Sequence, residues 1–118
     1  MKNLAVWFDI PVVDLDRAIT FYSAVVAPLT KQQIGKFTIA VFPHGEAGGG
    51  CLAQMDDDKP SAQGPLIYLS VEGRLDAALT AVTANGGKIL KPKESIAPHG
   101  FRAIVLDCEG NRIALHSM

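Results

Sequence analysis

The chain contains the same helical pattern twice, and this repeat limits the possible folds more than any other feature of the sequence. Residues 15–24 read LDRAITFYSA and residues 75–84 read LDAALTAVTA, so that Leu, Asp, Ala and Thr recur in register. Two unrelated amphipathic helices can share apolar positions by chance, and that is the alternative, but a shared Asp and a shared Thr are harder to explain in this way. The repeat predicts one structural unit present in two copies.

The correspondence continues beyond the helical segments. The first half matches the second at Phe37, Val41 and Phe42, which correspond to Phe101, Val105 and Leu106. A further match joins Cys51-Leu52 to Ala114-Leu115, with a small drift in the spacing. Loop insertions produce drift of this kind. A chain of 118 residues can bury one hydrophobic core but not two, so the two units are expected to share a core.

The order of patterns in each half predicts a βαβββ unit. Apolar residues alternate with period two around residues 6–12 and 66–71, as in strands, and an amphipathic helical pattern follows each run. Further strand-like runs lie at 29–33, 37–42 and 51–54 in the first half and at 88–90, 101–106 and 112–117 in the second. Residues 56–63 are acidic and contain a proline, which predicts a linker. The expected fold class is α+β, a single domain of residues 1–118 built from modules 1–55 and 64–118.

The composition argues against several kinds of partner. Eleven basic and 12 acidic residues give a formal charge of −1, and no basic run is present, so neither nucleic acid nor an anionic membrane surface is an expected partner. No segment approaches the ~20 apolar residues of a membrane-spanning helix. The first residues contain Asp9 and Pro11 and do not resemble a secretory signal, so a cytoplasmic location is expected.

Short motifs predict local structure. Asp14 is expected to cap the first helix, and Asn85-Gly86-Gly87 to supply left-handed residues after the second. Arg17 lies off the apolar stripe and is expected to form a surface ion pair of little energetic consequence. Glu109-Gly110-Asn111 is interpreted as a hairpin turn, and Gly48-Gly49-Gly50 as a turn before a strand.

Two further features are given structural interpretations. Cys51 and Cys108 are far apart in sequence and have no CxxC spacing, which indicates reduced thiols and neither a disulfide framework nor a zinc ribbon. Three adjacent aspartates at 56–58 are interpreted as a solvated turn because successive residues of a flexible loop rarely converge on one ion.

Two segments resemble a known family. The run IPVVDLDRAITFY near the start and LDCEGNRIALHSM at the end are similar to motifs of the vicinal oxygen chelate superfamily, which contains glyoxalase I, bleomycin-resistance proteins and extradiol dioxygenases. The resemblance covers nearly the whole chain. It implies helices on the convex face of a curled mixed sheet and a substrate cup on the other face. Each cup needs two modules, often from two chains, so the resemblance implies a homodimer with paired clefts.

The alternation of the strands agrees with such a cup. Alternate residues of each strand are expected to lie under the helices, namely Ile10, Val12, Ile67, Leu69, Val71, Ile113 and Leu115. The residues between them point to the opposite face and are expected to line the cup.

The resemblance also implies where a metal would be bound. Metal-using members carry one ligand on the first strand and one on the last strand of each half. These positions fall on Trp7, Cys51, Leu66 and Ala114. Trp, Leu and Ala do not ligate metals and one Cys is an incomplete shell, so the usual site is expected to be lost and no cofactor is expected. Without the ion, the family's signature reactions lose their electrophile.

Three ionisable residues remain on the expected cup face. Asp9, Tyr68 and His116 could bind a polar molecule, act as acid and base, or form a displaced metal site. Each also has a structural interpretation. Asp9 could bond neighbouring backbone, Tyr68 could be packing, and His116 could be an exposed residue near the C-terminus.

Three other residues are candidates for ligand contact. Trp7 offers a flat wall for stacking or plain packing, and Cys51 is either a reactive thiol or a small buried hydrophobe. His99 lies in a loop, Ala97-Pro98-His99-Gly100, that could be a lid or an exposed turn. His44 is interpreted as a surface residue.

Three functions are consistent with these features. The first is a metal-free protein of the bleomycin-resistance kind that binds a small organic molecule. The second is a glyoxalase-type lyase or isomerase that uses a displaced metal or Asp9, Tyr68 and His116. The third is an interaction module that regulates a partner protein, which has no sequence feature of its own.

Overall fold

The computed structural model describes residues 4–118, so the first three residues of the expected first module lie outside it. The first half contains β1 (Trp7–Pro11), α1 (Leu15–Val25), β2 (Thr30–Ile34), β3 (Phe37–Val41) and β4 (Gly49–Ala53). The second half contains β5 (Ile67–Ser70), α2 (Leu75–Ala84), β6 (Lys88–Ser95), β7 (Phe101–Leu106) and β8 (Arg112–Ser117). The α+β class and the two βαβββ units are confirmed.

Each half forms its own four-stranded sheet, with strand orders β1-β4-β3-β2 and β5-β8-β7-β6. The first strand of each half pairs in parallel with the last, and the remaining pairs are antiparallel. Asp9 is opposite Cys51 in one sheet and Tyr68 is opposite Ala114 in the other. The repeat seen in the sequence is therefore a repeat of strand order and register.

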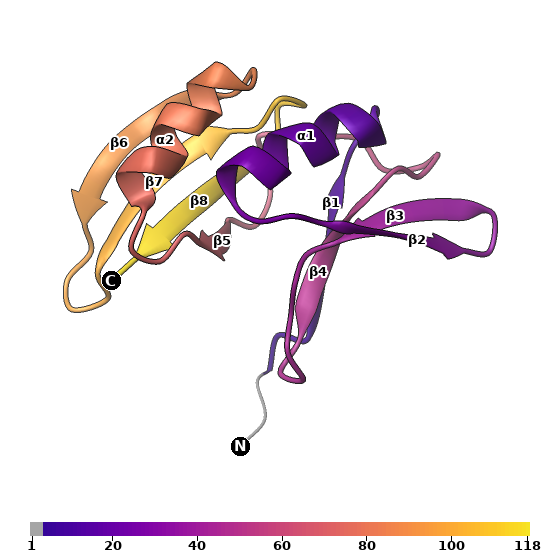
Figure 1. Cartoon of the computed structure of the whole chain (residues 1–118), viewed down its shortest axis with the longest axis horizontal. Helices are drawn as coiled ribbons and strands as arrows, with labels where there is room; N and C mark the ends of the chain where they lie inside the picture. Colours follow the sequence, from indigo (N-terminus) through magenta and orange to yellow (C-terminus); the bar gives the residue numbers. More distant parts are fainter. Residues whose placement is uncertain (1–3) are drawn as a thin grey trace.

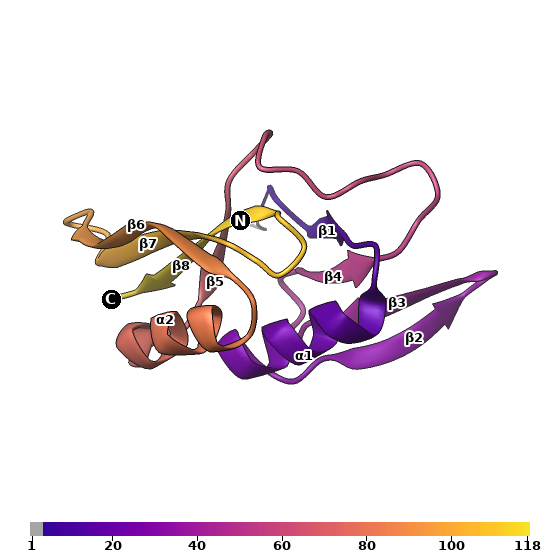
Figure 2. The same ribbon diagram turned by 90° about the horizontal axis from the view of Figure 1, so that it is seen from above.

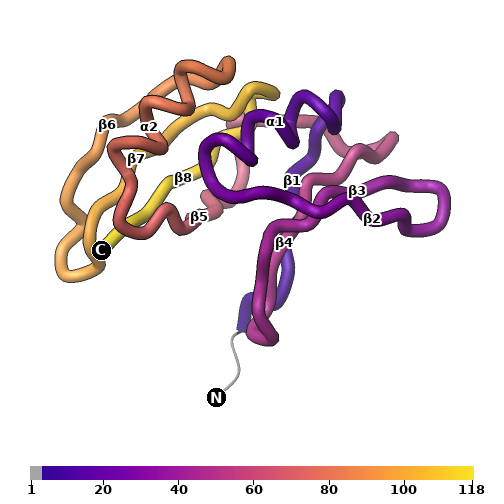
Figure 3. Tube along the Cα trace, in the orientation of Figure 1, coloured from indigo at the N-terminus to yellow at the C-terminus, as the bar shows by residue number. Residues whose placement is uncertain are grey.

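The two helices lie side by side and cover one face of both sheets (Figures 1 and 2). The trace in Figure 3 shows how helices far apart in the sequence become neighbours. One core cluster contains residues of both halves, including Phe21 and Tyr22 of α1 and Val82 of α2. No helix within residues 4–118 is long and apolar enough to cross a membrane.

The faces of the strands follow the alternation of the sequence. Six of the seven residues expected under the helices are buried in this core, and Ile67 packs against it partly buried. We call the opposite surface of each sheet, which the helices leave uncovered, its open face.

Two local predictions were wrong. Asn85 has φ −117°, so only Gly86, at φ +90°, takes the left-handed conformation after α2. Gly49 and Gly50 lie inside β4 and do not form a turn. A Cβ at Gly50 would lie 2.3 Å from the Phe8 ring, so glycine there permits close packing against β1.

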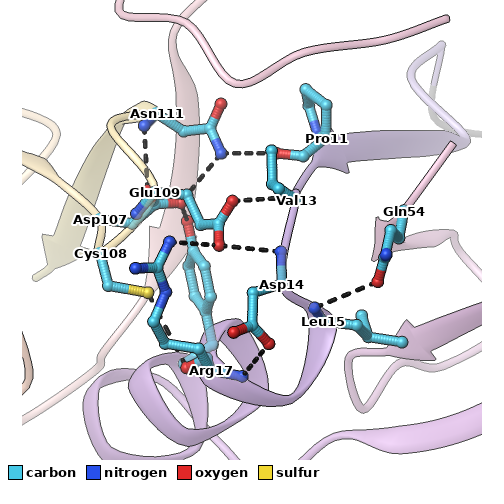
Figure 4. A network of polar contacts seen from close by, with 11 residues as sticks. Pro11, Val13, Asp14, Leu15, Arg17, Gln54, Asp107, Cys108, Glu109 and Asn111 are labelled. Carbon is cyan, nitrogen blue, oxygen red and sulfur yellow. Dashed lines mark hydrogen bonds and ion pairs between the residues drawn. The ribbon is translucent and has the colours of Figure 1, made fainter. Parts of the chain in front are cut away.

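The contact between the halves is centred on the Glu109 carboxylate (Figure 4). This side chain, 1% exposed, accepts hydrogen bonds from the Val13 amide at 2.5 Å, the Asp14 amide at 3.1 Å and Arg17 Nη2 at 2.7 Å. Burial alone would raise the pKa of Glu109, but the hydrogen bonds from Val13, Arg17 and Asp14 outweigh it and hold the pKa below its ordinary value of 4.5. The predicted ion pair of Arg17 is confirmed, and the Arg17 side chain is 55% exposed. Its partner Glu109 is buried at the N-terminus of α1, and the small energetic consequence expected for the pair stays a prediction.

Two more contacts complete this junction. The buried Tyr22 hydroxyl donates to Asp107 Oδ2 at 2.5 Å, and Asn111 Nδ2 donates to the Pro11 carbonyl at 2.7 Å. At the other end of α1, Arg74 Nη2 donates to the carbonyls of Val25 at 2.8 Å and Val26 at 2.6 Å. Residues of the second half therefore hold both ends of the first helix.

Candidate functional site

A row of polar side chains crosses the open face of the second sheet. Ser70 is opposite His116, His116 is opposite Arg102, and Arg102 is opposite Glu94. Because facing residues in neighbouring strands point to the same side, the four side chains form one line across β5, β8, β7 and β6. Tyr68 lies two residues before Ser70 and therefore shares this face.

A hollow of about 410 Å³ lies over part of this row. It is lined by Tyr68, Ser70, Ile96, His99 and His116. Its volume falls within the range of small-molecule sites, about 300–1,000 Å³. Three of the six residues predicted to contact a ligand, Tyr68, His99 and His116, therefore lie together.

The Tyr68 hydroxyl is fixed by Arg102, which was not among the predicted site residues. Arg102 Nη1 donates to the Tyr68 oxygen, and its Nη2 lies 3.4 Å from Glu94 Oε1. Arg102 Nε is buried and has no hydrogen-bond partner. The alternation of β7 provides a signal for Arg102, since Ala103 and Val105 are apolar residues of the opposite parity.

The His116 ring is held by the loop that contains His99. His116 Nε2 lies 2.5 Å from the His99 carbonyl oxygen, so it is the backbone of His99 that makes the contact. A carbonyl oxygen only accepts, which requires a proton on His116 Nε2 and leaves Nδ1 as the acceptor in the neutral ring. The centroids of the Tyr68 and His116 rings are 6.4 Å apart.

Trp7, Asp9 and Cys51 form a second group on the open face of the first sheet. Asp9 Oδ1 accepts from Trp7 Nε1 at 3.2 Å and from the Cys51 thiol at 3.3 Å. Trp7 also meets His44 edge to face, with ring centroids 5.5 Å apart. Burial, followed by the hydrogen bond to Asp9, raises the pKa of the Cys51 thiol to about 12. Cys51 is thus a protonated, buried thiol, 2% exposed.

The candidate residues therefore form two separate groups, one on each sheet. Asp9 also lines a hollow of about 480 Å³ between the edges of the two sheets, together with Ile67 and with Lys59 and Ser61 of the linker. That hollow contains neither Tyr68 nor His116.

The residues at the four family metal positions do not fit a metal. Leu66 and Ala114 have no donor atom, the Trp7 nitrogen donates to Asp9, and the Cys51 thiol holds its proton. Within residues 4–118, no group of three or more His, Cys, Asp or Glu side chains could hold an ion elsewhere.

The fold defines a class of duplicated α+β proteins. Members of this class have two βαβββ units with this strand order, a helix on each unit and polar groups on the open faces. The family model described as Glyoxalase/Bleomycin resistance protein/Dioxygenase superfamily matches residues 5–115, and the chain belongs to this superfamily. Among curated proteins, no sequence matches the chain significantly.

Solved structures share the fold. A glyoxalase/bleomycin resistance protein from Albidiferax ferrireducens T118 has a TM-score of 0.74 at 18% identity, over 98% of this chain and 99% of that one. A glyoxalase-related enzyme from Fulvimarina pelagi has a TM-score of 0.71 at 14% identity, over 98% and 88%. The fosfomycin resistance protein FosX from Listeria monocytogenes has a TM-score of 0.68 at 13% identity, over 100% and 92%. At these identities the likeness concerns the fold.

Proposed function

We propose that this protein binds a small organic molecule on the open faces of its sheets without a divalent metal at the four family positions. The observation that carries the proposal is the hollow of about 410 Å³ bounded by Tyr68, His99 and His116. Phenol, imidazole and hydroxyl groups around an apolar space can orient an organic ligand by hydrogen bonding.

The chemistry of Cys51 supports the metal-free part of this proposal. A thiol must lose its proton before it ligates a metal, and with a pKa of about 12 that loss is unfavourable near neutral pH. The other three positions offer no free lone pair. Four positions that are all unsuitable for a metal support the metal-free proposal more strongly than any one of them would alone.

We further propose that the ligand site is completed by a second copy of the chain. The hollow on the second sheet is lined only by residues of the second half. In a homodimer, the Trp7, Asp9 and Cys51 group of one copy would face this hollow in the other copy. A location in the cytoplasm is part of the same proposal.

A direct test combines elemental analysis with ligand screening. Protein purified without chelator should contain well under one equivalent of any transition metal, and its melting temperature should not change with EDTA, Zn²⁺, Ni²⁺ or Mn²⁺. A small-molecule library should yield compounds that raise the melting temperature and perturb the amides of residues 68–70, 96–99 and 116 in NMR spectra. A stoichiometric tightly bound ion, or hits that all map elsewhere, would contradict the proposal.

A second candidate, a lyase or isomerase with acid and base residues, is favoured by the pairing of Tyr68 and His116 in one hollow. Screening for turnover would test it, with Tyr68→Phe and His116→Gln as variants. Turnover unchanged by both substitutions would exclude this pair as acid and base. Because Asp9 lies on the other sheet, Asp9→Asn should affect turnover only in the dimer.

A further inference from the structure

The hydrogen bonds around the hollow determine which ligand groups it can accept. Arg102 has only donors, so the Tyr68 oxygen accepts from it, and the Tyr68 proton is free to point elsewhere. His116 has one nitrogen committed to the His99 carbonyl and Nδ1 free. The Ser70 hydroxyl, also in the lining, can donate or accept.

The charges around the hollow favour an anion. No carboxylate is among its lining residues. The positive charge of Arg102 lies directly behind the Tyr68 hydroxyl, with its carbon Cζ 6.0 Å from the centre of the Tyr68 ring. Its acidic partner Glu94 is at 3.4 Å with a side chain 40% exposed, so solvent weakens the neutralisation of the Arg102 charge by Glu94. The unpartnered Nε shows that the hydrogen-bonding capacity of Arg102 is not used up.

From this arrangement we infer that the hollow binds a small carboxylic acid in its ionised form. One carboxylate oxygen accepts from the Tyr68 hydroxyl, the other accepts from a proton on His116 Nδ1, and the apolar body lies against Ile96 and the two rings. With Nε2–H donating to the His99 carbonyl and Nδ1–H donating to the ligand, both nitrogens of a protonated His116 ring are satisfied. This inference rests on the proposed function, since it names the ligand class of the same site.

Binding should therefore be linked to the uptake of one proton. The charged and titratable groups that face His116 are Tyr68 on β5, Arg102 on β7, Glu94 on β6 beyond Arg102, and His99 in the loop. The proton taken up is the one on His116 Nδ1, which the neutral ring lacks while Nε2–H donates to the His99 carbonyl. Affinity should fall as pH rises from mildly acidic to mildly basic values, because a neutral Nδ1 and a carboxylate are both acceptors.

The test compares benzoate with its neutral isostere benzamide by NMR titration and calorimetry on the full chain. At pH 6, benzoate should bind at least tenfold more tightly than benzamide and shift the amides of residues 68–70, 96–99 and 116. Calorimetry in two buffers with different ionisation enthalpies should show proton uptake. Equal binding of both probes, no binding of benzoate, or shifts confined to other residues would overturn the inference.

Two substitutions separate charge at the site from charge in general. Arg102→Gln should weaken benzoate binding at least tenfold, whereas Lys93→Gln, which removes a charge paired with Asp76 at 3.1 Å, should change it less than twofold. Tyr68→Phe provides a second variant if Arg102→Gln is poorly folded. It should weaken benzoate several-fold and leave benzamide nearly unchanged, and equal effects of Arg102→Gln and Lys93→Gln would overturn the inference.

The two proposals can fail separately. If benzamide or uncharged library compounds bind at residues 68–70 and 116 while benzoate does not, the hollow is a ligand site and the carboxylate inference is wrong. If no compound of any charge perturbs these residues, the proposed function itself is wrong.

Discussion

At the scale of single residues, the environment of each polar group decides its chemistry. Cys51 and Cys108 are both free thiols, and burial is the largest cause that raises the pKa of each, to about 12 and about 11. Cys51 also donates to Asp9, which stabilises its protonated form. Neither thiol has the lowered pKa of a reactive cysteine.

The reactivity of Cys51 gives a first prediction. In a Cys108→Ser background, iodoacetamide should modify Cys51 at pH 7.5 far more slowly than a free cysteine, as measured by mass spectrometry of the intact protein. Asp9→Ala should increase this rate, because one of the groups that holds the thiol proton is removed, but burial should keep it below the rate of a free thiol. Rapid modification of Cys51 in the Cys108→Ser variant that retains Asp9 would contradict the burial and protonation of Cys51.

The Tyr22 hydroxyl gives a second prediction. Tyr22→Phe removes its bond to the buried Asp107 and should lower the free energy of unfolding by about 1–2 kcal/mol in urea denaturation. Burial, then the Asp107 charge and hydrogen bond, raise the pKa of Tyr22 well above its ordinary value of 10.0. The folded state therefore keeps a proton that the unfolded state loses, and stability should fall as pH rises above about 10. The variant should show a smaller fall, since the proton held by Tyr22 no longer contributes.

At the scale of the element, α1 is stabilised by groups of opposite charge at its two ends. Glu109 is negative and lies at the N-terminus, where the helix dipole is positive, and Arg74 is positive and lies at the C-terminus. Asp14 adds the expected cap by accepting from the Arg17 amide at 3.1 Å. The N-terminus of α2 has no side-chain cap.

Glu109→Gln gives a third prediction. It removes the charge that three donors share and should lower the free energy of unfolding by about 1.5–3 kcal/mol. The stabilisation from Glu109 should be present above pH 4.5 and be lost as pH falls through its lowered pKa in the folded state. Asp16→Asn, which removes an exposed pair with Lys31, is the control and should cost less than about 0.5 kcal/mol. Equal costs for the two variants would contradict a special role for Glu109.

Arg74→Ala gives a fourth prediction. It leaves two carbonyls at the end of α1 without their donor and should lower the free energy of unfolding by about 1–3 kcal/mol. The 11 residues of α1 separate Arg74 from Glu109 by roughly 16 Å at ~1.5 Å per residue, so the two costs should add in the double variant. A large departure from additivity would show that the two ends act as one unit.

The elements also show what the sequence could predict and what it could not. Alternation and helical spacing depend on neighbours in the chain, so they predicted the βαβββ order and the helix-covered faces correctly. β6 was predicted too short, at 88–90, because its pairing with β7 continues past Pro92 through two register shifts. The partners of Arg17 and Tyr22 lie 92 and 85 residues away, and no local pattern encodes such contacts. Tyr68 was singled out by its strand face, and Arg102 was not, although the alternation of β7 places Arg102 on the same open face.

At the scale of the whole molecule, exposed apolar residues gather at the start of β1. Leu4, Val6 and Trp7 are 95%, 64% and 45% exposed. Exposed apolar residues close together often mark a surface covered by a partner. They agree with the proposal that a second copy approaches the first sheet.

The assembly gives a fifth prediction. Light scattering coupled to size-exclusion chromatography should give twice the chain mass of 12.6 kDa. Val6→Asp should shift the population toward monomer and weaken ligand binding in parallel, whereas Ile34→Asp, at a residue also more than half exposed, should do neither. A monomer with full ligand affinity would show that one chain is sufficient for the site.

The contacts at the two ends of α1 make the two copies of the repeat unequal. A chain assembled from two first halves would have neither Glu109 nor Arg74, and one made from two second halves would lack Arg17, whose side chain donates to Glu109. Whatever ancestral unit was duplicated, the descendants can no longer substitute for each other. The two halves are therefore not interchangeable, because side chains of the second half bind both ends of the helix of the first half.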